Sequence, residues 1–527
     1  MENWNTLIHN GPLFPPEYVY RQIKVSVLGK IHVFSAEVEE LLTLWAQRIN
    51  TECVLDKTFK KNYWNDLKPY LPKDLQKTQF PNDWDFTEMV QMLNQIKIDK
   101  KSIAKDQRLM NESNALKLKE KHGYAILNGE RMALNSYIVE PPGIFMTRGK
   151  HPKYGCIKPR LKQSDITINA SEPLEGDWKA QICNKEGFYI ASWKQQVTGD
   201  TKYILFGSNS PVRQENDMIK FDKVHNLVKN LPNILSHIEK DLENNVGYQR
   251  KLATCCMLIA SLAIRVGDEK GEDEADTRGA TTLQAKHFTI SNDQVTLDFL
   301  GKDSIRYHRA ITMSPAMCAN LSQLLSNKEP DELMFNGISS KEVNEYFSSI
   351  LAGTTAKQFR TAYGSKLLAD NLQGIKQELT EREKLKAFND ANLVVAEKLN
   401  HHKAPPKNAK EQIGSKKDSL KNLKEEYKKI QKSVKSAKSD KEKLLAKQTA
   451  CANKIQNMED KIELQQKMLT VSMGTSKTNY SDPRITYSFC KKHGVNINTI
   501  YTATLQDKFS WAQNIDDSFF QNYGKII

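Results

Sequence analysis

Residues 407–468 read KNAKEQIGSKKDSLKNLKEEYKKIQKSVKSAKSDKEKLLAKQTACANKIQNMEDKIELQQKM, a stretch rich in lysine and glutamate that contains no proline. Apolar or small side chains recur in it at alternating steps of three and four, which is the seam of a coiled coil. The seam comprises Leu420, Leu423, Tyr427, Ile430, Val434 and Ala437, and then Leu444, Cys451, Ile455, Met458 and Ile462. Ser439-Asp440-Lys441-Glu442 has the spacing of a capping box, which predicts the start of a second helix. We expect an arm of two antiparallel helices of about 28 residues each, roughly 40 Å long.

The 210 residues at the N-terminus combine short strands with helices. Strand-like segments from Ile23 to Val33 precede helical spacing of apolar residues from Ala36 to Ile49. A charged helix is expected from about Ser102 to Lys121, and glycines then punctuate a run of short strands up to about residue 210. This part is therefore predicted to contain both helices and sheets.

Helices dominate from residue 211 to residue 403, interrupted by a hairpin pattern, VTLDFL-GKDS-IRYHRAIT, at 295–312. Cys255 and Cys256 lie in an apolar helix-like run, and the eight cysteines include no C-x-x-C pair, so we expect buried thiols in a reducing compartment. Beyond the arm, residues 469–527 predict a small helical module rich in aromatic side chains. The whole pattern is typical of an α+β multidomain protein.

The chain of 527 residues carries a net charge of +14. A strongly basic protein attracts polyanions, of which nucleic acid is the commonest, although a lysine-rich surface can also serve solubility alone. No apolar run reaches the length of about 18 residues that a membrane span needs. The opening MENWNTLIHNGPLFPP lacks a basic segment followed by an apolar core, so we expect neither a membrane partner nor secretion.

Several kinds of site lack their motif. No G-x-x-x-x-G-K-[ST] phosphate loop is present, and no H-E-x-x-H or paired-cysteine spacing predicts a metal site. The acidic stretch at 268–274 is interrupted by lysine and glycine, which is typical of a solvated loop. We therefore expect no cofactor and no metal.

A tyrosine near the C-terminus stands in the polar string SKTNYSDPRIT at 476–486. Tyr480 is expected to be poorly placed there for core packing, so it is either an exposed aromatic side chain or a nucleophile. Four other segments carry basic residues that also have plain interpretations as helix caps or a solvated turn. They contain Arg265 after an apolar helix, Lys302 in the hairpin turn, Arg360 on a helix with an apolar face, and His401 with His402 at another helix end.

As a set, the strings GKDSIRY, FRT, NH-x-x-APP and SK-x-NY-x-DPRIT resemble the active site of the eukaryotic-type DNA topoisomerase I family, and the similarity runs along nearly the whole chain. The resemblance implies a nucleophile, Tyr480, and four further catalytic residues, Arg265, Lys302, Arg360 and His401. Counting back from Ala404-Pro405-Pro406 favours His401, and His402 is the alternative. The residues expected to contact DNA are Arg148, Asp303, Asn479 and Lys220.

The resemblance implies a type IB topoisomerase, which relaxes supercoils by cutting one strand. Two arginines can hold the non-bridging phosphate oxygens while the tyrosine attacks, since their planar forks match phosphate geometry. Lys302 is expected to protonate the departing 5′ oxygen, which leaves a 3′-phosphotyrosine. Because a phosphoester is exchanged and not hydrolysed, neither ATP nor an obligatory metal is expected.

The family's architecture implies a bilobed clamp around double-stranded DNA, which is the expected partner. The protein is expected to be a monomer. It is expected in the nucleus, or in a viral replication compartment if the protein is viral. The predicted parts are core subdomain I at 1–18 and 105–210, core subdomain II at 19–104, catalytic core subdomain III at 211–403, the coiled-coil linker at 404–468 and the C-terminal domain at 469–527. Two alternatives stay open. A tyrosine recombinase shares the residue set but usually lacks the long arm, and a catalytically inactive clamp would not need all five positions filled.

Overall fold

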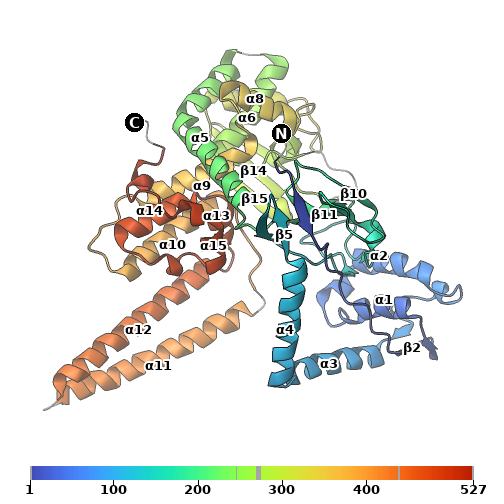
Figure 1. The fold of residues 1–527 in the computed structure, drawn as a ribbon. Helices are drawn as coiled ribbons and strands as arrows, with labels where there is room; N and C mark the ends of the chain where they lie inside the picture. The colour runs from blue at the N-terminus through green and yellow to red at the C-terminus, as the bar shows by residue number, and fades with distance from the viewer. Residues whose placement is uncertain (1–2, 245, 269–274, 407, 437–439, 525–527) are drawn as a thin grey trace. The chain divides into compact units, whose positions relative to one another are not determined.

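The computed structural model describes residues 3–244, 246–268, 275–406, 408–436 and 440–524. The chain forms two compact units (Figure 1). The first covers Met1–Gln214 with Lys270–Asp276, and the second covers Glu215–Glu269 with Thr277–Ile527. Each unit has hydrophobic cores of its own, as expected of an α+β multidomain protein.

One core of the first unit lies between a small sheet and three helices. The elements are β2 (Lys24–Val27), β3 (Lys30–Val33), β4 (Trp84–Asp85), α1 (Ala36–Ala46), α2 (Lys57–Leu67) and α3 (Thr87–Ser102). Strands β2 and β3 form a hairpin, and β4 pairs with β2. Helix α1 begins after Ser35, whose side chain accepts a hydrogen bond from the Val38 backbone N–H. The predicted strands and the predicted first helix are confirmed, although the helix ends at Ala46 and not at Ile49.

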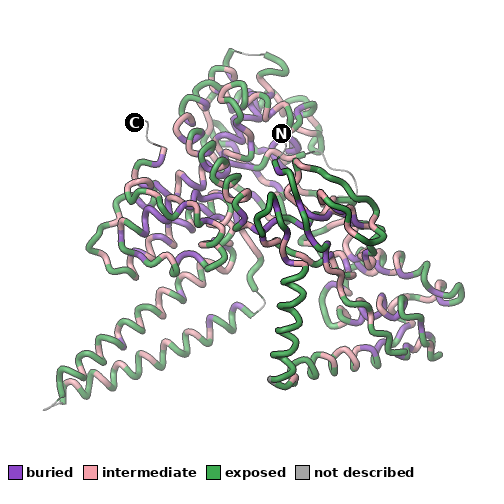
Figure 2. Tube along the Cα trace, viewed as in Figure 1, coloured by how far each residue is buried: buried purple, intermediate pink, exposed green. Residues whose placement is uncertain are grey.

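The other core of this unit is rich in strands, with sheets of the order β1-β5-β6 and β10-β9-β11-β12. The separate β7-β8 pair contributes Ile144 and Ile157 to the first core. The strands are β1 (Leu7–His9), β5 (Tyr124–Leu127), β6 (Glu130–Ala133), β7 (Gly143–Ile144), β8 (Ile157–Lys158), β9 (Thr167–Asn169), β10 (Ala180–Ile182), β11 (Tyr189–Lys194) and β12 (Thr201–Leu205). The predicted charged helix is confirmed as α4 (Lys105–His122), whose described side chains are almost all exposed (Figure 2).

The second unit is mainly helical around one large core. The helices before the arm are α5 (Pro211–Asn244), α6 (Gly247–Leu262), α7 (Pro315–Leu325), α8 (Ser340–Ile350), α9 (Ala356–Leu372) and α10 (Glu381–Lys398). The predicted hairpin is confirmed as β14 (Gln294–Gly301) and β15 (Ile305–Thr312), and β13 (Phe288–Ser291) completes their sheet. Cys255 and Cys256 are fully buried in α6, as predicted.

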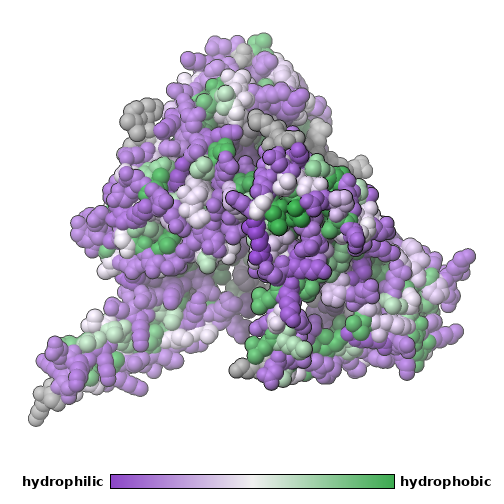
Figure 3. Space-filling view, viewed as in Figure 1, coloured by the Kyte–Doolittle hydropathy of each residue, from purple (hydrophilic) through white to green (hydrophobic). Residues whose placement is uncertain are grey.

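The predicted arm is confirmed as α11 (Ala409–Ser436) and α12 (Lys441–Lys467), which run side by side (Figure 1). Its seam is partly buried and the other positions face solvent, so hydrophilic residues cover most of its visible surface (Figure 3). The predicted capping box is wrong in one respect, because the residue before α12 is Asp440, with φ of 57° and no side-chain cap hydrogen bond. Ser439 and Ala437 lie outside the described residues.

The chain then returns to the large core through three short helices. They are α13 (Met473–Asn479), α14 (Pro483–His493) and α15 (Ala503–Lys508). Tyr480 stands in the turn between α13 and α14. No helix among the described residues is long and apolar enough to cross a membrane.

Candidate active site

Arg360 projects from α9 to a point where two other helices end. Its Nη1 donates to the carbonyl of Ala263 at 2.6 Å, and its Nη2 donates to the carbonyl of Leu399 at 2.8 Å. Ala263 and Leu399 are the C-cap residues of α6 and α10, so the guanidinium satisfies carbonyls that a helix end leaves without an intrahelical donor. The side chain is thereby fixed in place although it carries a charge and is only 7% exposed.

Arg265 follows the end of α6 and is positioned by its backbone. Its carbonyl accepts a hydrogen bond from the Ala280 N–H at 2.8 Å. Next to it, Gly267 has φ of 87°, and a Cβ on Gly279 would lie 2.5 Å from the Gly267 Cα, so the two segments can approach only as glycines. The Arg265 side chain is exposed, and its Nη2 donates to the Tyr480 hydroxyl at 3.2 Å.

His401 lies just after α10, and hydrogen bonds fix its backbone on both sides. Its N–H donates to the Ala396 carbonyl at 2.8 Å, and its carbonyl accepts from the Ser472 N–H at 2.7 Å. The ring is buried, its Nε2 lies 3.4 Å from Arg360 Nη2, and its centroid lies 5.0 Å from that of Tyr480. Because arginine can only donate, Nε2 is the acceptor in this arrangement. His402 instead forms an isolated β-bridge with the segment after the arm.

The side chain of Tyr480 lies next to those of Arg360, Arg265 and His401. Its hydroxyl accepts from Arg265, and its ring centroid lies 5.1 Å from the guanidinium carbon of Arg360. The expectation that Tyr480 is poorly placed for core packing is wrong, since the residue is only 8% exposed and belongs to the large core. The polar string around it forms a turn that packs against α9, which buries the ring while the hydroxyl meets the arginines.

The charges of this cluster act on its titratable groups. Burial tends to raise the pKa of Tyr480, but Arg360 and then Arg265 oppose it, and the result is a pKa below the ordinary value of 10.0. Burial, followed by the positive charges of Arg360, Arg265 and His402, lowers the pKa of His401 to about 3. The imidazole is therefore neutral near pH 7, while the tyrosine is easier to deprotonate than a free one.

The structure places the remaining predicted residues on other elements and at helix ends. Lys302 is exposed at the tip of the β14–β15 hairpin, where Asp303 adopts a left-handed backbone conformation. Asn479 is exposed at the end of α13, directly before the tyrosine, and Lys220 lies on α5. Arg148 is exposed on a loop of the first unit. The structure thus brings together four of the five predicted catalytic residues. The fifth, Lys302, lies apart from them at the tip of its hairpin.

Within the described ranges, side chains that commonly bind metal ions do not gather near this cluster. Among the residues that the structure describes, no group of three or more His, Cys, Asp or Glu side chains is arranged to hold an ion. Most of the acidic stretch at 268–274 lies outside the described residues.

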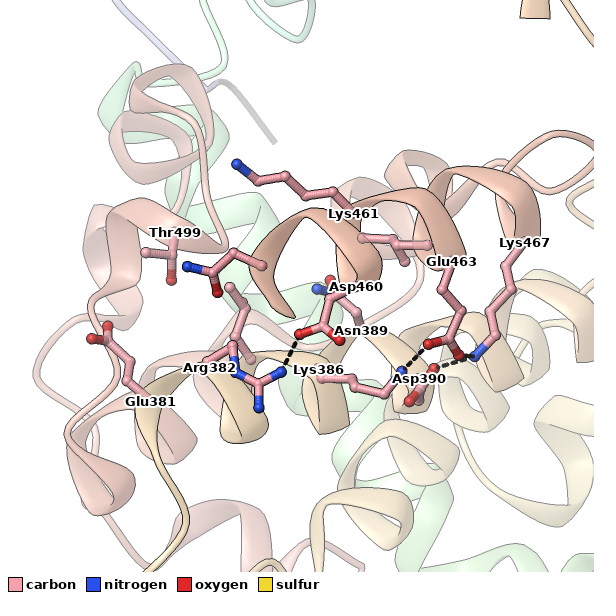
Figure 4. A pocket seen from close by; sticks show the side chains of 13 residues that line it. Glu381, Arg382, Lys386, Asn389, Asp390, Asp460, Lys461, Glu463, Lys467 and Thr499 are labelled. Carbon is pink, nitrogen blue, oxygen red and sulfur yellow. Dashed lines mark hydrogen bonds and ion pairs between the residues drawn. The ribbon is translucent and has the colours of Figure 1, made fainter. Parts of the chain in front are cut away.

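A pocket of about 380 Å³ opens at the base of the arm, between α10 and α12, and none of the predicted catalytic residues lines it (Figure 4). Ion pairs cross from one helix to the other along it. They join Arg382 to Asp460 at 2.5 Å, Lys386 to Glu463 at 2.6 Å and Lys467 to Asp390 at 2.9 Å. The α10 residues are spaced by four, so they share one face of the helix and form a ladder, here called the arm-base ladder.

Comparison with known proteins identifies the family of the chain. Family models match residues 2–206 (Eukaryotic DNA topoisomerase I, DNA binding fragment), residues 209–434 (Eukaryotic DNA topoisomerase I, catalytic core) and residues 452–521 (C-terminal topoisomerase domain). The chain is 31% identical to DNA topoisomerase 1 of Mus musculus over 98% of its own length and 71% of the mouse protein. It belongs to the eukaryotic DNA topoisomerase I family.

Other members of the family are longer. DNA topoisomerase 1 beta of Arabidopsis thaliana and DNA topoisomerase 1 of Drosophila melanogaster are each 31% identical to the chain, which spans 59% and 55% of their lengths. The catalytic-core match ends at residue 434 inside the arm, and the match to the C-terminal domain begins at residue 452 inside the arm and continues to residue 521.

The sequence interpretation missed three residues that hold the tyrosine. Gly364 and Ser365 on α9 lie against the backbone of Tyr480, and the N–H of Asp482 after the turn donates to Ser365 Oγ. Only Asp482 has a signal in the sequence, because an Asp followed by Pro is typical of the first residues of a helix.

Proposed function

We propose that this protein is a type IB DNA topoisomerase, which relaxes supercoiled DNA by cutting one strand with Tyr480 and resealing it. The observation that carries the proposal is the meeting of the Tyr480 hydroxyl with Arg265, beside the fixed guanidinium of Arg360 and the ring of His401. Membership of the eukaryotic DNA topoisomerase I family supports the same activity.

In the proposed cleavage step, the scissile phosphate lies between the two guanidinium groups, which donate to its non-bridging oxygens. Arg360 and Arg265 stabilise the negative charge that builds up on the pentavalent phosphorus, and they also favour loss of the Tyr480 proton to solvent. A bond forms between the tyrosine oxygen and phosphorus, and the bond from phosphorus to the 5′ oxygen breaks. His401 is neutral and donates a hydrogen bond to the phosphate from one ring nitrogen.

The departing 5′ oxygen takes its proton from Lys302, an ammonium group on an exposed hairpin tip that can move toward the DNA end. The 3′-phosphotyrosine keeps the energy of the phosphodiester, so the 5′ hydroxyl can attack it and restore the strand. Torsional strain drives rotation between the two steps. Neither ATP nor an obligatory metal takes part in this sequence.

The proposed partner is double-stranded DNA, bound by a monomer in the nucleus, and its phosphates attract the net charge of +14. Asn479 and Asp303 flank the proposed catalytic residues in the sequence and are proposed to contact the DNA there. Lys220 and Arg148 are proposed to contact its backbone elsewhere. The clamp and the five-part division of the chain also stay predictions of the resemblance.

His401 is the better candidate than His402 for the catalytic histidine. Its ring is buried against Tyr480 and Arg360, whereas the backbone of His402 pairs with Val471. The glutamine variant of each histidine separates the two assignments, because only the catalytic one is expected to lower the cleavage rate.

The proposal is tested by relaxation of supercoiled plasmid in EDTA without ATP, for wild type and Tyr480→Phe. Wild type is expected to give a ladder of topoisomers, and the Phe variant is expected to give none while still binding the plasmid. Binding by wild type without relaxation would favour an inactive clamp. Joining or exchange of two DNA partners would favour a tyrosine recombinase.

A further inference from the structure

The backbone of the Tyr480 turn packs unusually close to helix α9. A Cβ on Gly364 would lie 2.4 Å from the Tyr480 carbonyl oxygen and 3.1 Å from the Tyr480 Cβ. A contact below 3 Å requires something to move, so the turn can seat in this way only because residue 364 has no side chain. Gly364 lies four residues after Arg360, on the same face of one helix. Helix α9 therefore sets the distance between the phosphate-binding arginine and the backbone of the nucleophile.

One hydroxyl on the same helix holds the residues on both sides of Ser481. Ser365 is fully buried, and its Oγ accepts a hydrogen bond from the Asp482 N–H at 2.9 Å. The same Oγ donates to the Tyr480 carbonyl at 3.4 Å, a longer contact. The two backbone groups converge on one side chain, which restricts rotation of the turn that carries the nucleophile.

The carboxylate of Asp482 fixes the far end of the turn. It is fully buried, caps α14 by accepting from the Arg484 N–H at 3.0 Å, and pairs with Arg484 Nη2 at 2.8 Å. Arg484 in turn reaches Asp222 on α5 at 2.6 Å and lies over the ring of Trp511. The turn is thus connected to α9, α14 and the part of α5 that contains Asp222, all within the second unit.

We propose that Ser365 and Asp482 are positioning residues for the nucleophile, which hold the Tyr480 hydroxyl at attacking distance from a phosphate bound by Arg360 and Arg265. This inference rests on the proposed function and adds to it the groups that orient the tyrosine. Neither residue touches the phosphate. Their effect acts through the backbone of Tyr480, and a displacement on the order of 1 Å can lower the rate of a positioned reaction by about 100-fold.

A buried serine that serves only stability is the alternative, and the chain offers a matched control for it. Ser488 on α14 is also fully buried, and its Oγ also accepts a hydrogen bond from a backbone N–H, that of Phe520, at 3.2 Å. Ser365→Ala and Ser488→Ala each leave one buried N–H without its acceptor. They differ in that only Ser365 contacts the turn of the nucleophile.

The experiment measures three quantities for wild type, Ser365→Ala, Asp482→Asn and Ser488→Ala. They are the single-turnover rate of covalent adduct formation on a nicked duplex at saturating enzyme, the dissociation constant for the same duplex, and the melting temperature. Asp482→Asn keeps the size of the side chain and one acceptor for the α14 cap, so it gives an independent result if Ser365→Ala fails to fold.

We expect Ser365→Ala and Asp482→Asn to form the adduct about 10- to 100-fold more slowly than wild type, with DNA affinity unchanged within about twofold. Ser488→Ala is expected to melt earlier but to cleave at the wild-type rate. The inference is overturned if the first two variants only melt earlier, or if Ser488→Ala slows cleavage equally. Absence of an adduct from wild type would instead contradict the proposed function.

Discussion

The turn that carries Tyr480 and the arm that precedes it along the chain are held in different ways. Residues Tyr480, Ser481 and Asp482 are 8%, 1% and 0% exposed, and packing and hydrogen bonds hold them against α9. In the arm, Ala409, Ile413, Cys451 and Ile462 are the buried residues among those described. The position of the Tyr480 turn is thus fixed by buried contacts. The two helices of the arm are held together by a narrow apolar seam and by charges on its surface.

The charged residues beside the Tyr480 turn and those at the base of the arm also differ in burial. Arg360 is buried and satisfies carbonyls at two helix ends, so removing it leaves polar groups without partners. The arm-base ladder is half exposed, and water can replace each partner (Figure 4). We therefore expect substitutions near the turn to change the rate of chemistry, and substitutions in the ladder to have small and salt-dependent effects.

The largest effect is expected for Arg360→Ala, which should lower the cleavage rate by about 10³-fold. The variant loses donors to the phosphate and leaves the carbonyls of Ala263 and Leu399 unsatisfied, so its melting temperature should also fall. Single-turnover cleavage and thermal unfolding measure the two effects. Arg131→Ala, which breaks an exposed ion pair of the first unit, is the control and should leave cleavage unchanged.

Lys302→Ala should lower the cleavage rate by about 10²-fold, because the variant loses the proposed proton donor to the departing 5′ oxygen, which lies on the exposed hairpin tip. A duplex with sulfur in place of the 5′ bridging oxygen has a leaving group that needs no proton. This substrate should restore the rate of Lys302→Ala but not that of Arg360→Ala. Equal rates of Lys302→Ala on both substrates would show that the lysine has another role.

His401 makes the stability of the second unit depend on pH. Its folded pKa of about 3 lies below the ordinary 6.5, so between these values the unfolded state binds a proton that the folded state does not. The free energy of unfolding should therefore fall as the pH is lowered from 7 to 4.5, by about 2 kcal/mol through this group. Denaturant unfolding of wild type and His401→Gln measures it, and the variant should lose less. A histidine exposed on α5, His237, provides the control His237→Gln, which should behave like wild type.

The smallest effect is expected in the arm-base ladder. The coupling free energy between Arg382 and Asp460 should be about 0–1 kcal/mol and should decline at high salt, since both side chains are partly exposed. A double-mutant cycle of Arg382→Ala and Asp460→Ala, read by unfolding at low and high ionic strength, measures it. If these variants slowed cleavage as much as Ser365→Ala does, the contrast between the two regions would be lost.

The sequence predicted the arm well because a coiled-coil seam is a one-dimensional pattern that a helix displays directly. It predicted the start of α12 less well, since Asp440 adopts a left-handed conformation that a capping pattern does not encode. The β14–β15 hairpin was predictable from its alternation and turn, and the structure pairs its strands over their full length.

The members of the candidate site came from their resemblance to a family, and their roles stay proposals. Periodicity alone could not bring Arg265, Arg360 and Tyr480 together, because they are far apart in the sequence. The polar string around Tyr480 also predicted poor core packing, since nothing in that string shows that Gly364 leaves room for the turn on another helix. Close approaches between backbones leave no periodic signal.

Locating the covalent bond between protein and DNA shows whether Tyr480 is the nucleophile at a site built by the two arginines. A 3′-labelled and a 5′-labelled nicked duplex would each be incubated with wild type, trapped with denaturant and digested with a protease, and the DNA-linked peptide sequenced by mass spectrometry. We expect DNA attached through a 3′ phosphate to the peptide that contains Tyr480, with no adduct from Tyr480→Phe. Attachment to another residue, or through a 5′ phosphate, would contradict this expectation.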